Sequence, residues 1–160
     1  MTTTTSYESE LERTGRIVFT IRGVSMRPLF HANEDAIVLE KRAPETLRNL
    51  DIVLFRRFDP DGWKYVLHRI VGREPDGRWI IAGDNCAGAD LVEAADILGV
   101  VVSAQRGGKR PIRLDGWRYA LYERLWCRPY RFRFVVLGLR NRVFGFLSKT
   151  KRKILSLGRK

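Results

Sequence analysis

A serine, a histidine and two aspartates in this chain are of the residue types that nucleophilic acyl transfer requires. They stand in three short segments in chain order: Ser25 in "GVSMRP", His68 in "LHRIVG", and Asp84 and Asp90 in "GDNCAGAD". A serine hydroxyl is a poor nucleophile at neutral pH, so it needs a base and donors for the oxyanion that it creates. Histidine is the usual base, provided that a carboxylate orients its second ring nitrogen. These residues raise the hypothesis of a Ser/His/Asp site.

Other residues compete for these roles, and spacing alone leaves the choice open. His31 lies six residues after Ser25, in a polar segment. Lys64 lies four residues before His68, and the alternation of a strand would put both side chains on one face. Its position beside the turn "DPDGW" favours a solvated lysine. Most chains of this length contain a serine, a histidine and an aspartate, so a solvent-facing serine and a structural histidine form the competing interpretation.

The segments that would position these residues have the pattern of strands. Six short runs are rich in β-branched or aromatic residues: "RIVFTI", "AIVLE", "DIVLFRRF", "KYVLHRIVG", "RWIIAG" and "ILGVVVS". The turn signals "DPDG" and "EPDG" predict two successive hairpins that share the strand of His68. We therefore expect one mainly β domain over residues 15–105, after a polar, frayed leader over residues 1–14.

The C-terminal extension, residues 106–160, differs from this domain. "RGGKRP" (106–111) resembles a linker, and "DGWRYALYERLWC" (115–127) predicts an amphipathic helix that Pro129 ends. Its apolar face is predicted from the spacing of Trp117, Leu121 and Leu125. Residues 130–158 fit a helix, although "YRFRFVV" also fits a strand.

Composition limits the class of protein. A chain of 160 residues, 44% hydrophobic and 30% charged, suits one soluble globular domain. The two cysteines, Cys86 and Cys127, have no metal-binding or disulfide spacing, so the sequence predicts a reduced compartment, no metal and no cofactor. The N-terminus lacks the pattern of a signal peptide, and no apolar run reaches the ~18 residues of a spanning helix. We expect a cytoplasmic protein.

The positive charge of the chain is concentrated in the extension. Residues 1–105 contain 13 Lys+Arg and 16 Asp+Glu, whereas residues 106–160 contain 17 Lys+Arg and 2 Asp+Glu. Aromatic residues interleave with the basic ones, and the chain ends in "SKTKRKILSLGRK". This composition fits an anionic membrane surface, which would hold the protein peripherally at the inner face of the membrane. It also fits nucleic acid, for which no motif is present, or a helix that packs its aromatics on the β domain and leaves its arginines solvated.

Taken together, the three segments "GVSMRPLF", "LHRIVG" and "GDNCAGAD" resemble the type I signal peptidase family in order and approximate spacing. The resemblance covers about residues 19–103. The family signature is a Ser-Met dipeptide followed by Pro, then a strand that carries the base before Arg and an aliphatic residue, then a Gly-Asp-Asn turn. Bacterial members have lysine as the base, whereas endoplasmic-reticulum and archaeal members have histidine. His68 therefore resembles the Ser-His type.

The resemblance implies a role for each residue. Ser25 would be the nucleophile, His68 the general base and Asp90 the carboxylate that orients it. Four residues would support the site: Gly23, Met26, Asp84 and Asn85. The family fold is a coiled β-sheet domain that binds a polypeptide substrate as an extended strand, with shallow pockets for small side chains.

The chain also departs from the family. Many members have a hydroxyl residue two positions before the nucleophile, which helps to form the oxyanion hole, and this chain has Gly23 there. Cys86 replaces a commonly polar residue after the Gly-Asp-Asn turn, and Glu34 and Leu50 replace glycines before aspartates. Self-cleaving repressors of the same superfamily share Gly-x-Ser-Met but pair serine with lysine, which argues against self-cleavage here. No N-terminal membrane anchor is evident.

The sequence therefore predicts a serine endopeptidase that processes a leader or precursor peptide. The alternatives are a catalytically silent relative that binds peptides in the same groove, and a membrane-surface or nucleic-acid-binding protein driven by the basic extension.

Overall fold

A computed structural model of the protein describes the backbone of residues 7–157 and the side chains of residues 7–146. The elements follow the chain in this order: α1 (Tyr7–Thr14), β1 (Arg16–Thr20), β2 (Asp35–Glu40), the 3-10 turn η1 (Pro44–Thr46), β3 (Ile52–Asp59), β4 (Gly62–Arg73), β5 (Trp79–Ala82), β6 (Asp90–Val92), the 3-10 turn η2 (Ala94–Asp96), β7 (Ile97–Arg106), β8 (Arg110–Ile112), α2 (Trp117–Tyr122), the π-helical turn η3 (Glu123–Cys127) and α3 (Tyr130–Leu157).

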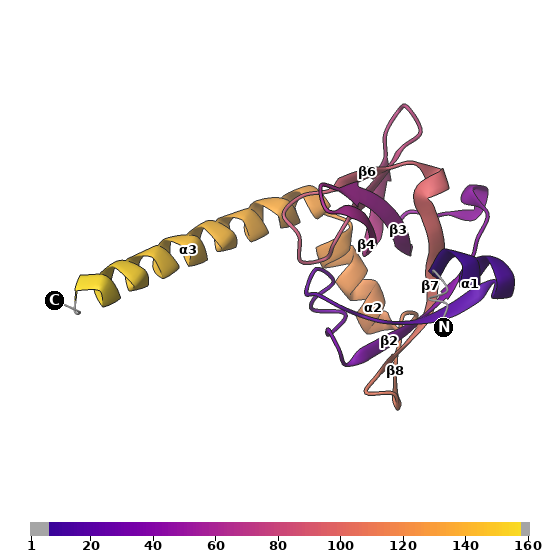
Figure 1. Cartoon of the computed structure of the whole chain (residues 1–160), viewed down its shortest axis with the longest axis horizontal. Coiled ribbons are helices and arrows are strands. Elements are labelled where there is room, and N and C mark those ends of the chain that lie inside the picture. The colour runs from indigo at the N-terminus through magenta and orange to yellow at the C-terminus, as the bar shows by residue number, and fades with distance from the viewer. Residues whose placement is uncertain (1–6, 158–160) are drawn as a thin grey trace.

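The strands form one open antiparallel sheet of eight strands (Figure 1), which confirms the prediction of a mainly β fold. The strand order is β1-β2-β7-β3-β4-β5-β6, and β8 pairs with β7. The register shifts once in each of three pairings, β2 with β7, β3 with β7, and β4 with β5. Such irregularities bend and twist a strand locally.

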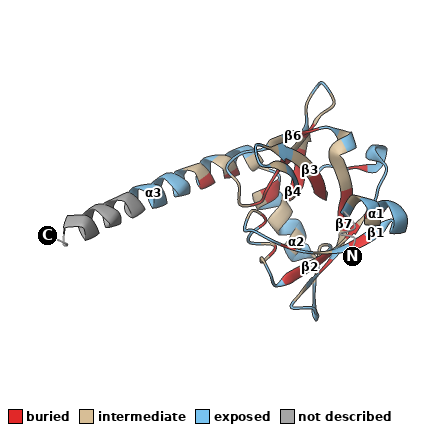
Figure 2. Ribbon diagram, viewed as in Figure 1, coloured by how far each residue is buried: buried red, intermediate tan, exposed pale blue. Residues whose placement is uncertain are grey.

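Both faces of the sheet are covered, and β3 shows this most clearly. Ile52 and Leu54 belong to one buried cluster, whereas Val53 and Phe55 belong to the other. Successive side chains of a strand point to opposite faces, so this alternation places β3 between two apolar layers. Figure 2 shows the buried residues of this strand. The strand next to it, β4, carries His68 and is fixed in register by the pairing of Val53 with His68.

All six predicted strands are present, but two short ones were not predicted. The additional strands are β6, with three residues, and β8, also with three. The segment 106–111 is not a linker, because it ends β7, turns and begins β8. Gly107 and Gly108 make this turn with positive φ angles of 58° and 67°, a conformation that glycine adopts without strain. The sheet therefore continues to Ile112.

The predicted frayed leader is partly wrong. Residues 7–14 form α1, and Leu11 is buried in the core beside β1. One buried leucine on a short polar helix gave no clear helical period in the sequence. The remaining leader residues, 1–6, lie outside the described part of the chain.

After β8, the described part of the C-terminal extension consists of α2, η3 and α3, so the strand alternative for "YRFRFVV" is wrong. The predicted helix over residues 115–127 is confirmed as α2 followed by η3, and α3 extends from the sheet domain as an arm (Figure 1). The predicted apolar face is wrong, since Trp117, Leu121 and Leu125 are exposed. No helix within the described residues is long and apolar enough to cross a membrane.

Candidate active site

Ser25 lies in the loop of residues 21–34 that connects β1 to β2. Two buried side chains, Met26 and Phe30, anchor this loop in the core, and the amide of Phe30 donates to the carbonyl of Met26 at 3.1 Å. Gly23 has a φ of 77°, in the left-handed region where a side chain would be strained. The loop therefore holds the backbone around Ser25 in one arrangement, and Gly23 supports it by its conformation.

The far end of this loop is held by an ion pair. Arg106 donates to both carboxylate oxygens of the buried Asp35 at 2.9 and 3.0 Å, and to the carbonyl of Leu29 at 3.1 Å. His31 lies nearby, with its Nδ1 3.4 Å from a carboxylate oxygen of Glu34. The side chain of His31 is 39% exposed. It is therefore a surface histidine that pairs with its own loop.

His68 is the histidine that the fold buries beside a carboxylate. His68 is only 8% exposed, and its Nδ1 lies 3.4 Å from Oδ2 of Asp90, the first residue of β6. This is an ion-pair distance, and Nδ1 makes no well-aligned hydrogen bond with any described residue. Hydrogen bonds that orient a general base are often long or poorly aligned before substrate binds, so this contact fits such a pair.

The charges at this pair reinforce each other. Burial disfavours the charged imidazolium, but the contacts with Asp90 and Cys86 outweigh it, so the pKa of His68 lies above its ordinary value. The contact with His68 lowers the pKa of Asp90, against the effect of burial, and Arg57 lowers it further. Arg57 donates to Oδ1 of Asp90 at 2.7 Å. Asp90 is thus held as an anion, with one oxygen turned to an arginine and one to the histidine.

The segments carrying Ser25, His68 and Cys86 converge at Gly83. A Cβ at this position would lie 2.7 Å from the Ser25 carbonyl oxygen, 2.7 Å from the Cys86 sulfur and 2.9 Å from Nε2 of His68. Real Cβ atoms essentially never approach other atoms so closely. Glycine is therefore the residue that lets the loop of Ser25 and the strand of His68 come together across the turn.

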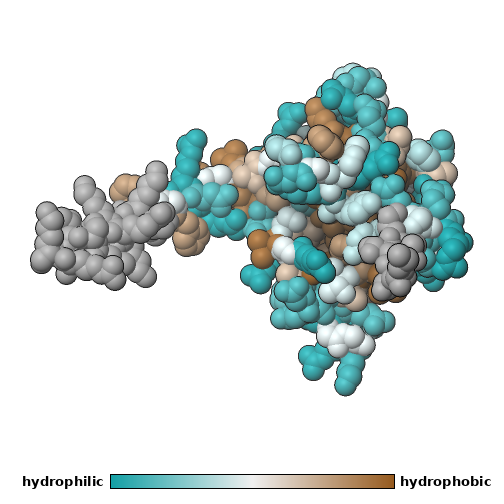
Figure 3. All heavy atoms as spheres, viewed as in Figure 1, coloured by the Kyte–Doolittle hydropathy of each residue, from teal (hydrophilic) through white to brown (hydrophobic). Residues whose placement is uncertain are grey.

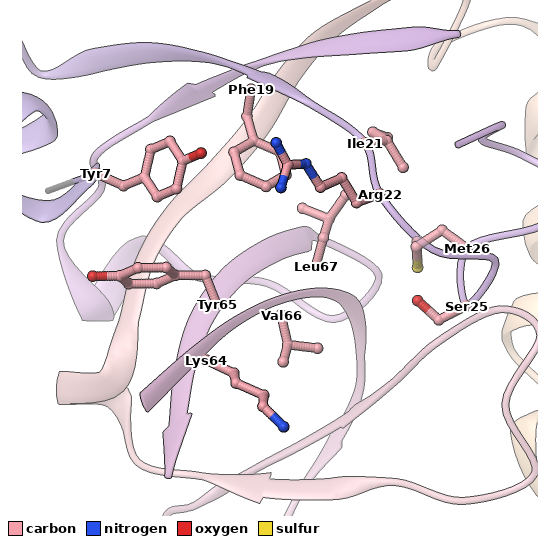
Figure 4. A pocket seen from close by; sticks show the side chains of 10 residues that line it. All are labelled: Tyr7, Phe19, Ile21, Arg22, Ser25, Met26, Lys64, Tyr65, Val66 and Leu67. Carbon is pink, nitrogen blue, oxygen red and sulfur yellow. The ribbon is translucent and has the colours of Figure 1, made fainter. Parts of the chain in front are cut away.

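Ser25 itself presents two groups that matter for chemistry. Figure 4 shows its hydroxyl directed toward the interior of a pocket. Neither this hydroxyl nor the Ser25 amide makes a hydrogen bond with the described backbone of residues 7–157 or the described side chains of residues 7–146. The nearby Nε2 of His68 lies 4.0 Å from the sulfur of Cys86. Catalytic hydrogen bonds are often long before substrate binds, so an unengaged hydroxyl and a free amide are compatible with a resting site.

Asp84 is committed to a different partner, Arg69, and both side chains are fully buried. Nε and Nη2 of Arg69 donate to the two carboxylate oxygens at 3.0 and 2.8 Å. Its Nη1 donates to the carbonyl of Leu50 at 3.0 Å and to the hydroxyl of Tyr119 at 2.9 Å. Burial opposes the charge of Arg69, but Asp84 outweighs it and holds the pKa of Arg69 well above its ordinary value. Of the two candidate aspartates, Asp90 is therefore the one beside His68.

Four side chains of the C-terminal extension also reach Asp84. The Tyr122 hydroxyl donates to its carboxylate at 2.9 Å, the Trp126 ring to its carbonyl at 2.9 Å, Arg133 to its carboxylate at 3.3 Å and the Cys127 thiol to its carboxylate at 3.9 Å. Arg133 is fully buried, and its Nε and Nη2 have no hydrogen-bond partner among the described residues. Burial raises the pKa of Tyr122, and the charge of Asp84 raises it further. The extension is therefore part of the support of this turn.

Asn85 connects that turn to the serine loop. Its amide donates to the carbonyl of Ser25 at 2.7 Å, and its side chain donates to the carbonyl of Val24 at 3.1 Å. Arg140 of α3 donates to the Asn85 side-chain oxygen at 2.8 Å. Asn85 thus holds the backbone of the candidate nucleophile on one side and is held by the long helix on the other.

A pocket of about 510 Å³ opens beside Ser25 (Figure 4). Its lining comes from α1, from β1 and the loop after it, and from β4: Tyr7, Phe19, Ile21, Arg22, Ser25, Met26, Lys64, Tyr65, Val66 and Leu67. Lys64 is 46% exposed and pairs with Asp59 and Asp61 at 3.2 Å. Its amine is therefore solvated and already paired with carboxylates, unlike the buried His68.

Two strand edges flank this pocket without a partner strand in the described part of the chain. β1 pairs with β2 alone, and β4 is joined by β5 only from Arg69 onward. Residues 62–68 of β4 therefore pair with β3 on one edge and leave the other edge open. Unpaired backbone amides and carbonyls of this kind can receive an added strand.

Sequence reasoning missed Arg57, Tyr122, Arg133 and Arg140, because each meets its partner across more than 30 residues of chain.

In residues 7–157, no group of three or more His, Cys, Asp or Glu could hold a metal ion. Comparison of the chain with protein-family models, with curated proteins and with solved structures finds no match. What the chain can do is therefore inferred from its own residues and geometry.

Proposed function

We propose that this chain is a serine endopeptidase similar to signal peptidases of the Ser-His type, with a sheet of the coiled form that this family has. Ser25 is the nucleophile, His68 the general base and Asp90 the carboxylate that orients the base. The observation that carries the proposal is the meeting of three segments: Nε2 of His68 and the Ser25 carbonyl lie within 3 Å of one point beside Gly83, and Asp90 lies 3.4 Å from Nδ1.

In this mechanism His68 is neutral and accepts the Ser25 proton at Nε2 while the serine oxygen attacks the peptide carbonyl carbon. Asp90 stabilises the imidazolium that forms, and the free Ser25 amide donates to the oxyanion. His68 then gives its proton to the leaving amine, which breaks the peptide bond and leaves an acyl-serine. Water, deprotonated by His68, attacks this ester, and the serine regains its proton as the acid leaves.

The substrate class follows from the walls of the pocket. The open edge of β4 offers backbone hydrogen bonds to an extended peptide, while apolar side chains such as Ile21, Val66 and Leu67 suit small apolar substrate side chains. Leader and precursor peptides are segments that present such an extended stretch. Affinity would come from the backbone, and selectivity from alternate side chains.

The test is a comparison of new protein N-termini, mapped by mass spectrometry, in the native host with the wild-type chain or variants. Ser25→Ala and His68→Ala should each remove the same set of termini. Ser103→Ala, at an exposed serine on β7, is the matched control and should leave the set intact. Identical termini in all four strains, with all variants folded and expressed, would contradict peptidase activity.

A second function, peptide binding without cleavage, is favoured by two observations. The Ser25 hydroxyl makes no hydrogen bond to His68 in the described part of the chain, and Gly23 supplies no side-chain donor to an oxyanion. A silent relative would use the same strand edge. In that case a peptide that binds in the pocket would bind the wild-type chain and Ser25→Ala equally well. Incubation with the wild-type chain would leave this peptide uncut.

A further inference from the structure

The outer face of α3 carries an apolar stripe that the sheet domain does not cover. Four side chains at helical spacing are more than half exposed: Phe132 (66%), Val135 (60%), Leu139 (56%) and Val143 (58%). With 3.6 residues per turn, positions separated by three, four, seven and eleven residues lie on one face. Figure 3 shows hydrophobic side chains on the surface of this arm. We call these four residues the outer stripe.

The orientation of the outer stripe is fixed by the opposite contacts of the same helix. Arg133 and Leu137 are buried, and Arg140 donates to Asn85. These three residues share another face, which docks on the turn of Asp84 and Asn85. The helix therefore cannot rotate to bury the outer stripe without breaking that contact.

The charge of this part of the chain selects the kind of partner. From residue 124 to the C-terminus there are 12 Lys+Arg and no Asp or Glu. On the described part of α3, the exposed Arg131 and Arg142 lie beside the outer stripe. An apolar face bordered by arginines complements the headgroup and acyl boundary of an anionic bilayer. Two copies of the helix would instead bring like charges together, and nucleic acid offers nothing aliphatic to the valines and the leucine.

Length and hydropathy decide between lying on a membrane and crossing it. α3 has 28 residues, which is about 42 Å of helix, yet no helix of the described residues is apolar enough to span. The terminal segment "SKTKRKILSLGRK", whose composition predicts the same partner, lies outside the residues with described side chains. The stripe of residues 132–143 supports the inference independently.

We infer that α3 lies in the interface of an anionic membrane, with its outer stripe buried among the lipids. Each apolar side chain removed from water contributes to binding, and each arginine near the surface adds an electrostatic contribution that salt screens. Because Arg133 and Arg140 of α3 contact the turn that holds the backbone of Ser25, this inference, combined with the proposed function, would place the pocket near the bilayer surface. The binding itself does not depend on catalysis.

The test is co-sedimentation of the full chain with vesicles of phosphatidylcholine, with or without phosphatidylglycerol. We expect binding to the anionic vesicles only, and weaker binding at high salt. The double variant L139Q/V143Q, which keeps the charge and helix propensity, should bind at least roughly tenfold more weakly. V18Q/L91Q is the matched control, because it changes two exposed apolar residues on the sheet and should bind like wild type.

A second pair of variants tests the charge without touching the stripe. Replacing Arg131 and Arg142 by Gln should weaken binding roughly fivefold for each arginine. Equal binding to neutral vesicles, no binding to anionic ones, or unchanged binding of L139Q/V143Q would overturn the inference. A dimer of the wild-type chain that the L139Q/V143Q variant no longer forms would also overturn the inference, because a second copy of the chain would then cover the outer stripe. Ser25→Ala should bind vesicles like wild type, so that failure of the proposed catalysis and failure of membrane binding are told apart.

Discussion

Replacing Asp84 by Asn should strongly destabilise the protein. The Asp84 side chain is fully buried and faces two guanidinium groups, of Arg69 and Arg133, that are also fully buried. Each of its two oxygens accepts a hydrogen bond from Arg69, and one of them also accepts a hydrogen bond from the Tyr122 hydroxyl. Asn keeps the shape but removes the negative charge and one acceptor.

The magnitude follows from the burial of these charges. Removing one partner of a buried ion pair leaves the other charge uncompensated, which typically costs about 3–5 kcal/mol. Glu123 is the next carboxylate to Arg69, at 3.4 Å and 22% exposed, so it compensates only in part. In a domain of this size each kcal/mol lowers the melting temperature by about 2–4 °C. We therefore expect a loss of about 6–20 °C.

Arg133→Met provides a matched comparison at the same carboxylate. Arg133 makes only one hydrogen bond to Asp84, at 3.3 Å, and leaves Nε and Nη2 without partners among the described residues. When Arg133 is replaced, Asp84 still accepts two hydrogen bonds from Arg69 and so stays compensated, while the desolvation of a poorly satisfied guanidinium is relieved. Arg133→Met should therefore change the free energy of unfolding by no more than about 1 kcal/mol in either direction.

Thermal and urea unfolding followed by circular dichroism would measure both variants under the same conditions. The two methods should rank them in the same order, with Asp84→Asn far below wild type and Arg133→Met near it. A melting temperature of Asp84→Asn within about 3 °C of wild type would refute the reasoning, because the buried guanidinium groups would then not depend on Asp84. Equal losses in both variants would refute the distinction between the two arginines.

Three further predictions concern the candidate active site itself. Asp90→Asn removes the anion that raises the pKa of His68, so the plateau rate should fall about 10⁴-fold. The acid limb of the pH profile of kcat/KM should then move to lower pH, because the base is active when neutral; an unmoved limb would count against this pairing. Gly83→Ala should abolish peptide cleavage, whereas Gly88→Ala in the same loop, with nothing within 4 Å of its Cβ, should not; equal activities would show that the close approach is relaxed. Cys86→Ala should retain activity within about threefold, and complete loss would make the thiol the nucleophile instead.

The sheet was predictable because its longer strands carry their own signal. Runs such as "DIVLFRRF" and "KYVLHRIVG" are β-branched or aromatic, and the turns between them contain Pro-Asp-Gly, so strand and hairpin follow from local preference. β6 and β8 have three residues each, too few for alternation to be read. They exist because a neighbouring strand, β5 or β7, offers a free edge. Such strands depend on tertiary pairing and not on their own sequence.

The helical extension was predictable in type but not in orientation. Spacing alone favours Trp117, Leu121 and Leu125 as the buried face, because they are the apolar residues at helical intervals. The helix instead turns Tyr122 and Trp126 inward, since their polar ends can satisfy the buried Asp84. The demand for hydrogen bonds around a buried charge therefore outweighs apolar periodicity. No pattern within the extension itself could reveal that demand.

The assignment of the two aspartates needed the fold as well. From sequence, Asp84 and Asp90 are both downstream of His68, and only the resemblance to signal peptidases favours Asp90. The geometry separates them, because the side chain of Arg69 occupies both oxygens of Asp84 while Asp90 begins β6 beside the histidine. Adjacent residues on one strand thus serve opposite faces. His68 meets Asp90 on one, and Arg69 meets Asp84 on the other.

The basic extension also has a structural role, because it supports the turn of residues 83–85. Attraction of an anionic partner alone would not require this role. Arg133 and Arg140 point into the protein and hold Asp84 and Asn85, although arginines used only to attract an anionic partner would all face outward. The outer stripe begins at Phe132, next to the first of these contacts. In the proposed arrangement, a bilayer that orients α3 also orients the turn, because rotation of the helix would break both arginine contacts. The proposed membrane binding would therefore be linked to the placement of Ser25 through one helix.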